Sequence, residues 1–127
     1  MLELAARFQS DEPVRVREIA DAHQIPPQFL VQILLQLKNA GLVASTRGAA
    51  GGYRLLAPPQ DISMWDVVAA MEGPRGESAA APGSPFAAAL SELWSDIGCL
   101  QQDALRRSNF ADLLERAKQG LEGMYYI

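Results

Sequence analysis

The sequence contains little of what a disulfide, a metal centre or a membrane span requires. Its 127 residues include one cysteine, Cys99, and one histidine, His23. A single cysteine excludes a disulfide within the chain and is typical of a protein in a reducing cytoplasm. No apolar run approaches the ~20 residues that span a bilayer, and residues 1–13 lack the features of a signal peptide. We therefore expect a cytoplasmic protein without membrane contact and without a cofactor.

Arrangements typical of an enzyme are also missing. The sequence shows no nucleophile beside a base, no cluster of metal ligands and no cofactor loop. The glycines of "STRGAAGGYRL", residues 45–55, are not followed by the lysine and Ser/Thr of a phosphate-binding loop. His23 has no second ligand near it and is expected to be a surface or capping residue. The sequence therefore does not predict an enzyme.

Charge is divided unevenly along the chain. The net charge is −4, but residues 1–58 carry six Lys/Arg and five Asp/Glu, a net charge of +1. Residues 59–127 carry five Lys/Arg and ten Asp/Glu, a net charge of −5. The overall sign argues against nucleic acid as a partner. If there is one, the first half would meet it and the acidic second half would face elsewhere.

The predicted elements of the first half are two short helices, a longer helix and a β-hairpin. The helices are expected at residues 2–9, at residues 15–23 and from residue 27 to about residue 40, where Gly41 would be the left-handed cap. The predicted buried stripe of the third helix comprises Phe29, Leu30, Ile33, Leu34 and Leu37. Residues 42–46 and 53–56 are strand-like, and the glycine-rich loop would join them.

Three further helices are expected in the second half. Ser63 and Asp66 form a predicted capping box for a helix over residues 64–72. A small, polar loop then precedes a long amphipathic helix over residues 86–107, and a last helix begins at Ser108 or Asn109, followed by the tail "MYYI". Apolar residues of the long helix recur every three to five positions, at Phe86, Leu90, Leu93, Ile97, Leu100 and Leu105.

This order of elements predicts a mainly α fold with a small β-hairpin wing. It is a winged helix–turn–helix followed by a long C-terminal helix for dimerisation. We expect a winged helix–turn–helix domain over residues 1–73 and a flexible loop over 74–85. Dimerisation helices and the tail would then occupy residues 86–127.

A winged helix suits duplex DNA. The first turn of a recognition helix enters the major groove, and there Gln28 and Gln32 share one face and could bond adenine. Phe29 could contact a thymine methyl group or the sugar backbone. In the wing, Arg47 would enter a narrow minor groove. Gly48, Gly51 and Gly52 would let the main chain approach phosphates, with Tyr53 at the wing's base. Alternatively, the glutamines are a solvated helix face and the glycines only a tight turn.

The segment "LKNAGLVASTRGAAGGYRL" resembles the Rrf2 family of bacterial winged-helix regulators, which includes IscR, NsrR and CymR. The resemblance is strong over residues 14–73 and loose over the C-terminal helices. It implies a homodimer that binds a partly palindromic operator, with Arg47 as the wing arginine and Gln28 and Phe29 as recognition-helix contacts. The expected seam between the two long helices contains Leu90, Leu93, Trp94, Ile97 and Leu100. The function implied is a DNA-binding regulator acting as a repressor.

The chain departs from this family in three respects. The loop before the long helix lacks the three cysteines of cluster-binding members, and one thiol does not supply the roughly four ligands of an iron–sulfur cluster. Cys99 is expected to be a small buried hydrophobic residue; a cluster shared between protomers and a redox-sensing thiol are alternatives. Val31 stands where relatives can carry a glutamate that discriminates sites. Finally, the first helix is short, so either Met1 is not the true start or a basic contact segment is absent.

Without a cluster, a signal would arrive by another route. The tail residues Tyr125, Tyr126 and Ile127 suit the substrate cleft of O-acetylserine sulfhydrylase, which accepts tails ending in isoleucine, and CymR-like members use that enzyme as a partner. The alternative is a tail that packs its tyrosines on the dimer helix. The rival to DNA binding is a winged-helix protein-interaction module, a possibility favoured by the sequence pI of about 4.9.

Overall fold

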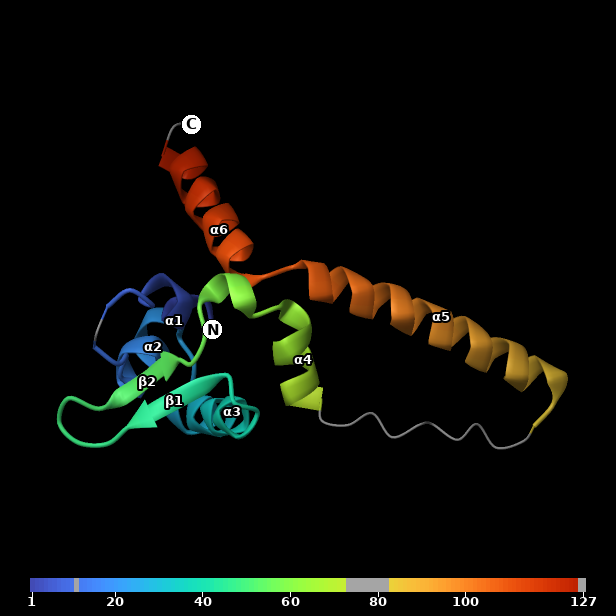
Figure 1. Cartoon of the computed structure of the whole chain (residues 1–127), viewed down its shortest axis with the longest axis horizontal. Coiled ribbons are helices and arrows are strands. Elements are labelled where there is room, and N and C mark those ends of the chain that lie inside the picture. Colours follow the sequence, from blue (N-terminus) through green and yellow to red (C-terminus); the bar gives the residue numbers. More distant parts are fainter. Residues whose placement is uncertain (11, 73–82, 126–127) are drawn as a thin grey trace.

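The structure is a computed structural model that describes residues 1–10, 12–72 and 83–125. It is mainly helical with one antiparallel hairpin, which confirms the predicted fold class (Figure 1). In chain order the elements are α1 (Leu2–Ala6), α2 (Val16–His23), α3 (Pro27–Asn39), β1 (Val43–Thr46), β2 (Gly52–Leu55), the 3-10 helix η1 (Pro59–Asp61), α4 (Met64–Glu72), α5 (Pro85–Arg107) and α6 (Phe110–Tyr125).

One hydrophobic core joins α1, α2, α3 and the hairpin. Its side chains come from every element of the first half, because each contributes one apolar face to a common centre. Phe110, from the first residue of α6, is 4% exposed and belongs to the same core. The buried residues are Leu4, Ala5, Val14, Ile19, Ala20, Leu30, Leu34, Leu37, Val43, Leu55, Ile62 and Phe110.

Backbone hydrogen bonds tie the start of α6 to the segment before α4. The Met64 amide donates to the Ser108 carbonyl at 2.7 Å, and the Phe110 amide donates to the Ile62 carbonyl at 3.0 Å. The division into residues 1–73, 74–85 and 86–127 remains a prediction. The two hydrogen bonds at Met64 and Phe110 place the first turn of α6 against the winged-helix core.

Two local predictions about helix ends are confirmed. The Asp66 amide donates to the Ser63 hydroxyl at 3.1 Å, and the Ser63 amide donates to the Asp66 carboxylate at 2.9 Å, which is the reciprocal capping box. Gly41 has a φ of +79° just beyond α3. That left-handed backbone favours glycine and ends the helix.

Two other predicted ends were wrong. Helix α1 stops at Ala6, three residues early, and Arg7 leaves it to donate to Glu18 of α2 at 2.7 Å while pairing with Glu3 at 3.0 Å. The hydrogen bond to Glu18 and the nearby Glu3 carboxylate raise the pKa of Arg7. Helix α6 continues to Tyr125, so the first two residues of the predicted tail are helical.

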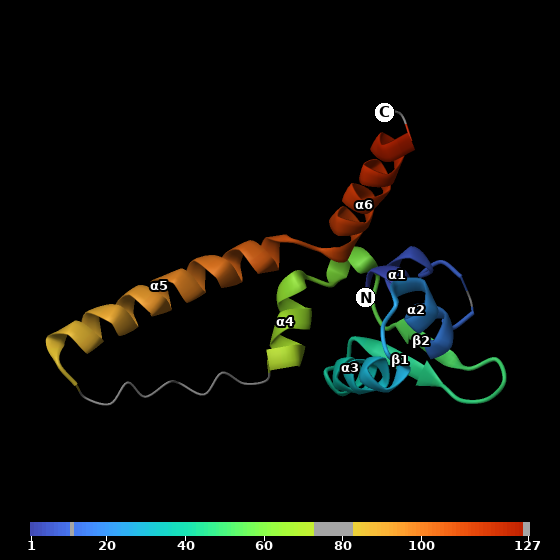
Figure 2. The ribbon, with the colours of Figure 1, turned by 180° about the vertical axis from the view of Figure 1, so that it is seen from behind.

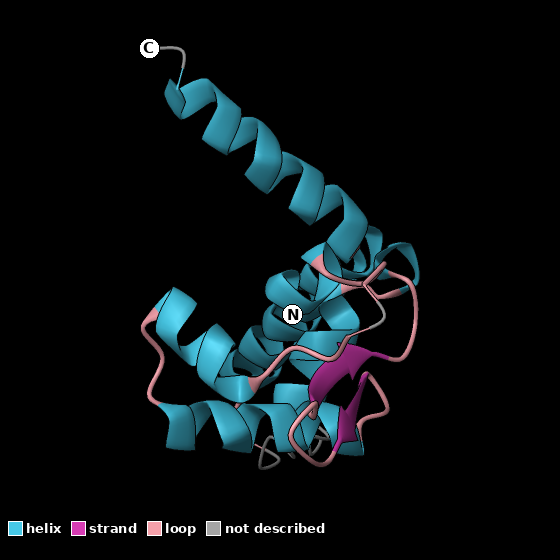
Figure 3. Ribbon diagram, turned by 90° about the vertical axis from the view of Figure 1, so that its left-hand side faces the viewer, coloured by secondary structure: helices cyan, strands magenta, loops and turns pink. Residues whose placement is uncertain are grey.

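Helix α5 extends away from the winged-helix core in both the front and the rear view (Figures 1 and 2). It contacts α4 near its C-terminal end, where the Arg106 guanidinium lies 5.8 Å from the Trp65 ring centre. Helix α6 then turns back to pack on α1 and η1 before projecting away from the hairpin (Figure 3). Most of α5 therefore has no packing partner among the described residues.

Candidate nucleic-acid interface

Helices α2 and α3 form the predicted helix–turn–helix. Helix α2 ends at His23 and is capped by Gln24, whose backbone is left-handed (φ 54°), and the Ile25 amide donates to the Ala20 carbonyl at 3.0 Å. Pro26 caps the start of α3, and Pro27 is its first residue. A proline is tolerated there because its missing N–H is not needed in the first turn. Gln28 and Gln32 are exposed at the beginning of α3, one turn apart. The arrangement leaves their amides free to meet a groove.

Phe29 does not belong to the buried stripe of α3. Its side chain is 61% exposed, and Ile33 is only half-buried. Successive helical residues are turned by roughly 100°, so Phe29 lies outside the seam centred on Leu30, Leu34 and Leu37, which are buried. The exposure of Phe29 keeps the other prediction for it, a contact with DNA, geometrically open.

The hairpin is the predicted wing. Strands β1 and β2 pair antiparallel with Thr46 opposite Gly52, and residues 47–51 form the turn. Gly48 has a φ of +107°, which favours glycine there. A side chain on Gly52 would lie 2.4 Å from the Val14 carbonyl oxygen, so glycine is needed for that close approach. Arg47 is exposed at the start of the turn.

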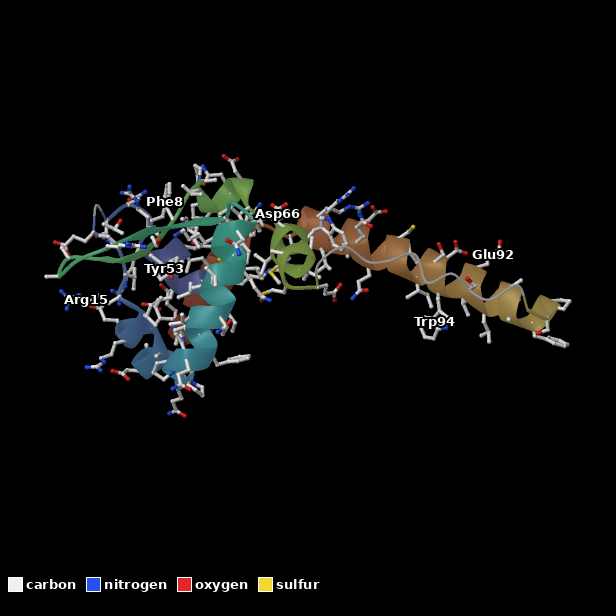
Figure 4. The ribbon with its side chains drawn as sticks, turned by 90° about the horizontal axis from the view of Figure 1, so that it is seen from below. Phe8, Arg15, Tyr53, Asp66, Glu92 and Trp94 are labelled. Carbon is white, nitrogen blue, oxygen red and sulfur yellow. The ribbon has the colours of Figure 1, made fainter. Side chains whose placement is uncertain are left out.

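Tyr53 packs partly buried against the core at the base of the wing. Its backbone pairs with Val14: the Val14 amide donates to the Tyr53 carbonyl and the Tyr53 amide to the Val14 carbonyl, both at 2.8 Å. Tyr53 and Arg15 lie at the hairpin end of the domain (Figure 4). The segment before α2 is therefore joined to β2 by an isolated antiparallel bridge.

A recess of about 640 Å³ lies beneath the wing. Three cationic side chains from three parts of the chain border it: Arg15 from the N-cap of α2, Lys38 from the last turn of α3 and Arg47 from the wing. The described lining residues include no carboxylate. Arg15 and Lys38 were not predicted from the sequence as members of this site, because their proximity to the wing depends on chain segments far apart in sequence.

The seam residues predicted on α5 are all exposed in the single chain. Their exposed fractions range from 43% to 71%, and no described residue of α5 is buried. Trp94 and Glu92 point to opposite sides of the helix (Figure 4), so α5 is amphipathic as predicted. The exposed seam comprises Leu90, Leu93, Trp94, Ile97 and Leu100.

The expectation that Cys99 is buried was wrong for the single chain, in which the residue is exposed. Seven residues make about two helical turns, so Cys99 lies on the side of α5 that carries Glu92, away from the apolar seam. Of the predicted partner-binding tail, Tyr125 ends α6, and Tyr126 and Ile127 lie outside the described residues. The binding role of these three residues stays a prediction.

His23 is an exposed surface residue, as expected: its Nε2 lies 3.2 Å from a carboxylate oxygen of Glu3. Within residues 1–10, 12–72 and 83–125, no three His, Cys, Asp or Glu side chains gather as a metal site would require. No helix in the described part of the chain is long and apolar enough to cross a membrane.

Comparisons with known proteins agree on one family. The family model described as "Rrf2: Iron-dependent Transcriptional regulator" matches residues 1–116. The chain is 46% identical over 76 residues to an rrf2-like HTH-type transcriptional regulator of Rhodobacter capsulatus, covering 58% of this chain and 51% of that protein. It is 32% identical to CymR of Bacillus subtilis over 128 residues, covering 100% of this chain and 91% of CymR.

Solved structures give the same result. The structure of B. subtilis CymR matches with a TM-score of 0.75, covering 91% of this chain and 87% of that chain. IscR of T. potens matches with a TM-score of 0.76 at 30% identity, covering 94% of this chain and 80% of that chain. The chain spans about half the length of the R. capsulatus relative.

The iron in the description of the family model does not fit the residues of this chain. An iron–sulfur cluster takes about four ligands, mostly thiolates, whereas the sequence has one cysteine and one histidine. Cys99 is on α5 and His23 is at the end of α2, beside Glu3. The donor set of this chain therefore does not match a resident cluster.

Proposed function

The chain belongs to the Rrf2 family of transcriptional regulators and has its DNA-binding winged-helix fold, and from this premise we propose that it acts as a homodimeric repressor without an iron–sulfur cluster. Its relatives are transcriptional regulators and not enzymes. The observation that carries the proposal is the exposure of Gln28 and Gln32 on α3 together with Arg47 on the adjoining wing. Repression is proposed because a dimer that occupies promoter DNA is sufficient for it.

The spacing of these residues supports contact with two neighbouring grooves. Lys38 borders the recess under the wing with Arg47, and Gln28 lies ten positions earlier on the same helix. At 1.5 Å per residue, that is about 15 Å along the axis of α3. Half a turn of B-DNA is roughly 17 Å. This length supports the proposal that the glutamines enter the major groove and Arg47 the adjacent minor groove, with Gly48, Gly51, Gly52 and Tyr53 shaping the wing.

The exposed seam of α5 supports dimerisation. Monomeric soluble proteins rarely expose a continuous apolar patch of this kind. A second copy of the chain offers the same face, and a two-fold interface is self-complementary by construction. Leu90, Leu93, Trp94, Ile97 and Leu100 would then be covered by their counterparts. Two wings on one dimer match two half-sites of a partly palindromic operator.

Binding of the purified protein to duplex DNA tests the proposal. We expect selection from random DNA to enrich a partly palindromic sequence. The affinity should fall steeply between about 50 and 200 mM salt, because phosphate contacts release counterions. Absence of salt-dependent binding would instead favour the protein-interaction module suggested by the acidic pI.

A partner protein is the proposed route of signalling. The solved structure of the relative CymR is described as that of the global cysteine regulator of B. subtilis, and O-acetylserine sulfhydrylase is the partner we propose for Tyr125, Tyr126 and Ile127. The apolar and aromatic character of these residues supports it. Deleting Ile127 should abolish binding to that enzyme, measured by calorimetry. Equal binding with and without Ile127, or none with the intact chain, would end this idea.

A further inference from the structure

The segment before α2 is attached to the wing at two points. Val14 and Tyr53 exchange two backbone hydrogen bonds at 2.8 Å each, and Gly52 leaves room for the Val14 carbonyl. Val14 is itself 3% exposed and anchored in the core. The position of the next residue, Arg15, is therefore set by both the core and the root of the wing.

Arg15 makes the second attachment. Its guanidinium donates a hydrogen bond to the carbonyl of Ala49, in the turn of the wing, at 2.5 Å. The side chain is exposed, and a guanidinium has five N–H donors. Donors therefore remain for a further acceptor at the tip of the wing.

The recess that Arg15 borders has the charge of an anion site. Arg15, Lys38 and Arg47 place three positive charges around it, and the hydroxyls of Ser45 and Thr46 add uncharged donors. With no carboxylate among its described lining residues, the recess favours an anion over a cation. Guanidinium groups bind phosphate oxygens in a forked, directional way.

We propose that this recess binds one backbone phosphate of the duplex and that Arg15 contacts that phosphate while holding the wing at Ala49. The proposal rests on the proposed function and names a contact within the same interface. A wing held at its root and its tip loses less conformational freedom on binding than a free hairpin. Arg15 would thus place Arg47 before the DNA arrives.

Replacement of Arg15 by alanine, with Arg17→Ala as the matched control, tests the site. Arg17 is exposed, lies two residues on in α2 and is not among the described residues that line the recess. Binding of a random-sequence duplex is measured between about 50 and 200 mM salt. Arg15→Ala should weaken binding about tenfold and reduce the slope of log affinity against log salt by about one. Arg17→Ala should do neither.

The Arg15→Lys variant separates charge from geometry. It keeps one positive charge, so the salt slope should return to the wild-type value while part of the affinity loss remains. The midpoint temperature of thermal unfolding should be close to that of the wild type in all three variants, because Arg15 and Arg17 are both exposed. An Arg15→Ala protein with weakened binding but an unchanged slope would show a purely structural role and overturn the phosphate site.

Failure of the site and failure of the function look different. If wild-type protein binds the duplex and Arg15→Ala behaves like Arg17→Ala, the recess is not a phosphate site, but DNA binding stands. If wild-type protein shows no salt-dependent binding to any duplex, the proposed function fails and this inference fails with it.

Discussion

The helices of the winged-helix half and α5 are all amphipathic. Only those of the winged-helix half bury their apolar side chains within the same chain. Leu37 of α3 is 2% exposed, whereas Leu100 of α5 is 71% exposed. Helices α1, α2 and α3 and the hairpin face one another, so each covers its neighbours. Helix α5 points away from them and meets α4 near one end. Amphipathic periodicity therefore tells which face of a helix is apolar, but not whether the partner is the same chain.

The largest effect expected from this difference is on α5. Leu93→Glu places a charge in the proposed seam between two copies. An uncompensated buried charge costs about 3–5 kcal/mol. The dissociation constant of the dimer should therefore rise on the order of 100-fold or more. Sedimentation should show a folded monomer. Glu92→Gln, on the opposite side of the helix, is the control and should remain dimeric. A dimeric Leu93→Glu protein would place the interface on another face.

Substitutions in the winged-helix core should change the free energy of unfolding and not the oligomeric state. Leu37→Ala removes a fully buried side chain and leaves a cavity, which costs about 2–5 kcal/mol of unfolding free energy. Leu35→Ala, on the same helix at 46% exposure, should change that free energy by only about 0.5 kcal/mol or less. Chemical denaturation measures both. Equal effects of the two substitutions would contradict the core described for α3.

The smallest expected effect concerns Arg47 in the turn of the wing, whose exposed side chain takes no part in the hydrophobic core. Arg47→Ala should weaken operator binding by about 1–3 kcal/mol and leave sedimentation and unfolding unchanged. Arg54→Ala is the matched control. It removes the same charge from an exposed position on β2 that is not among the described residues lining the recess. An unaltered operator affinity for Arg47→Ala, or an equal loss for Arg54→Ala, would count against a specific role of the wing arginine.

Elements with strong local signals were predicted well. The capping box at Ser63, the proline start of α3 and the left-handed Gly41 depend on residues close in sequence, so their geometry follows from local chemistry. The resemblance carried by residues 37–55 likewise indicated the family that the comparisons identify. Boundaries that depend on distant contacts were missed: α1 ends early where Arg7 turns to Glu18.

The candidate site shows the same division. Gln28, Arg47 and the wing glycines could be predicted as site residues because the helix–turn–helix and the hairpin have recognisable sequences, and their contact with DNA stays a prediction. Arg15 and Lys38 were not, since nothing local indicates that either approaches the turn of the wing. Phe29 and Cys99 were assigned to buried positions from their apolar character, and both are exposed because each lies outside the apolar face of its helix.

By itself the sequence determined the order of helices and strands, the apolar face of each helix and the turn chemistry of the wing, because these follow from residues within one or two helical turns. Only the tertiary structure decided which faces become a core and which stay open. It alone brought Arg15 beneath a turn 34 residues further along the chain. Contacts between distant segments depend on how whole helix and sheet faces pack. No short stretch of the sequence indicates which distant segment will pack against it.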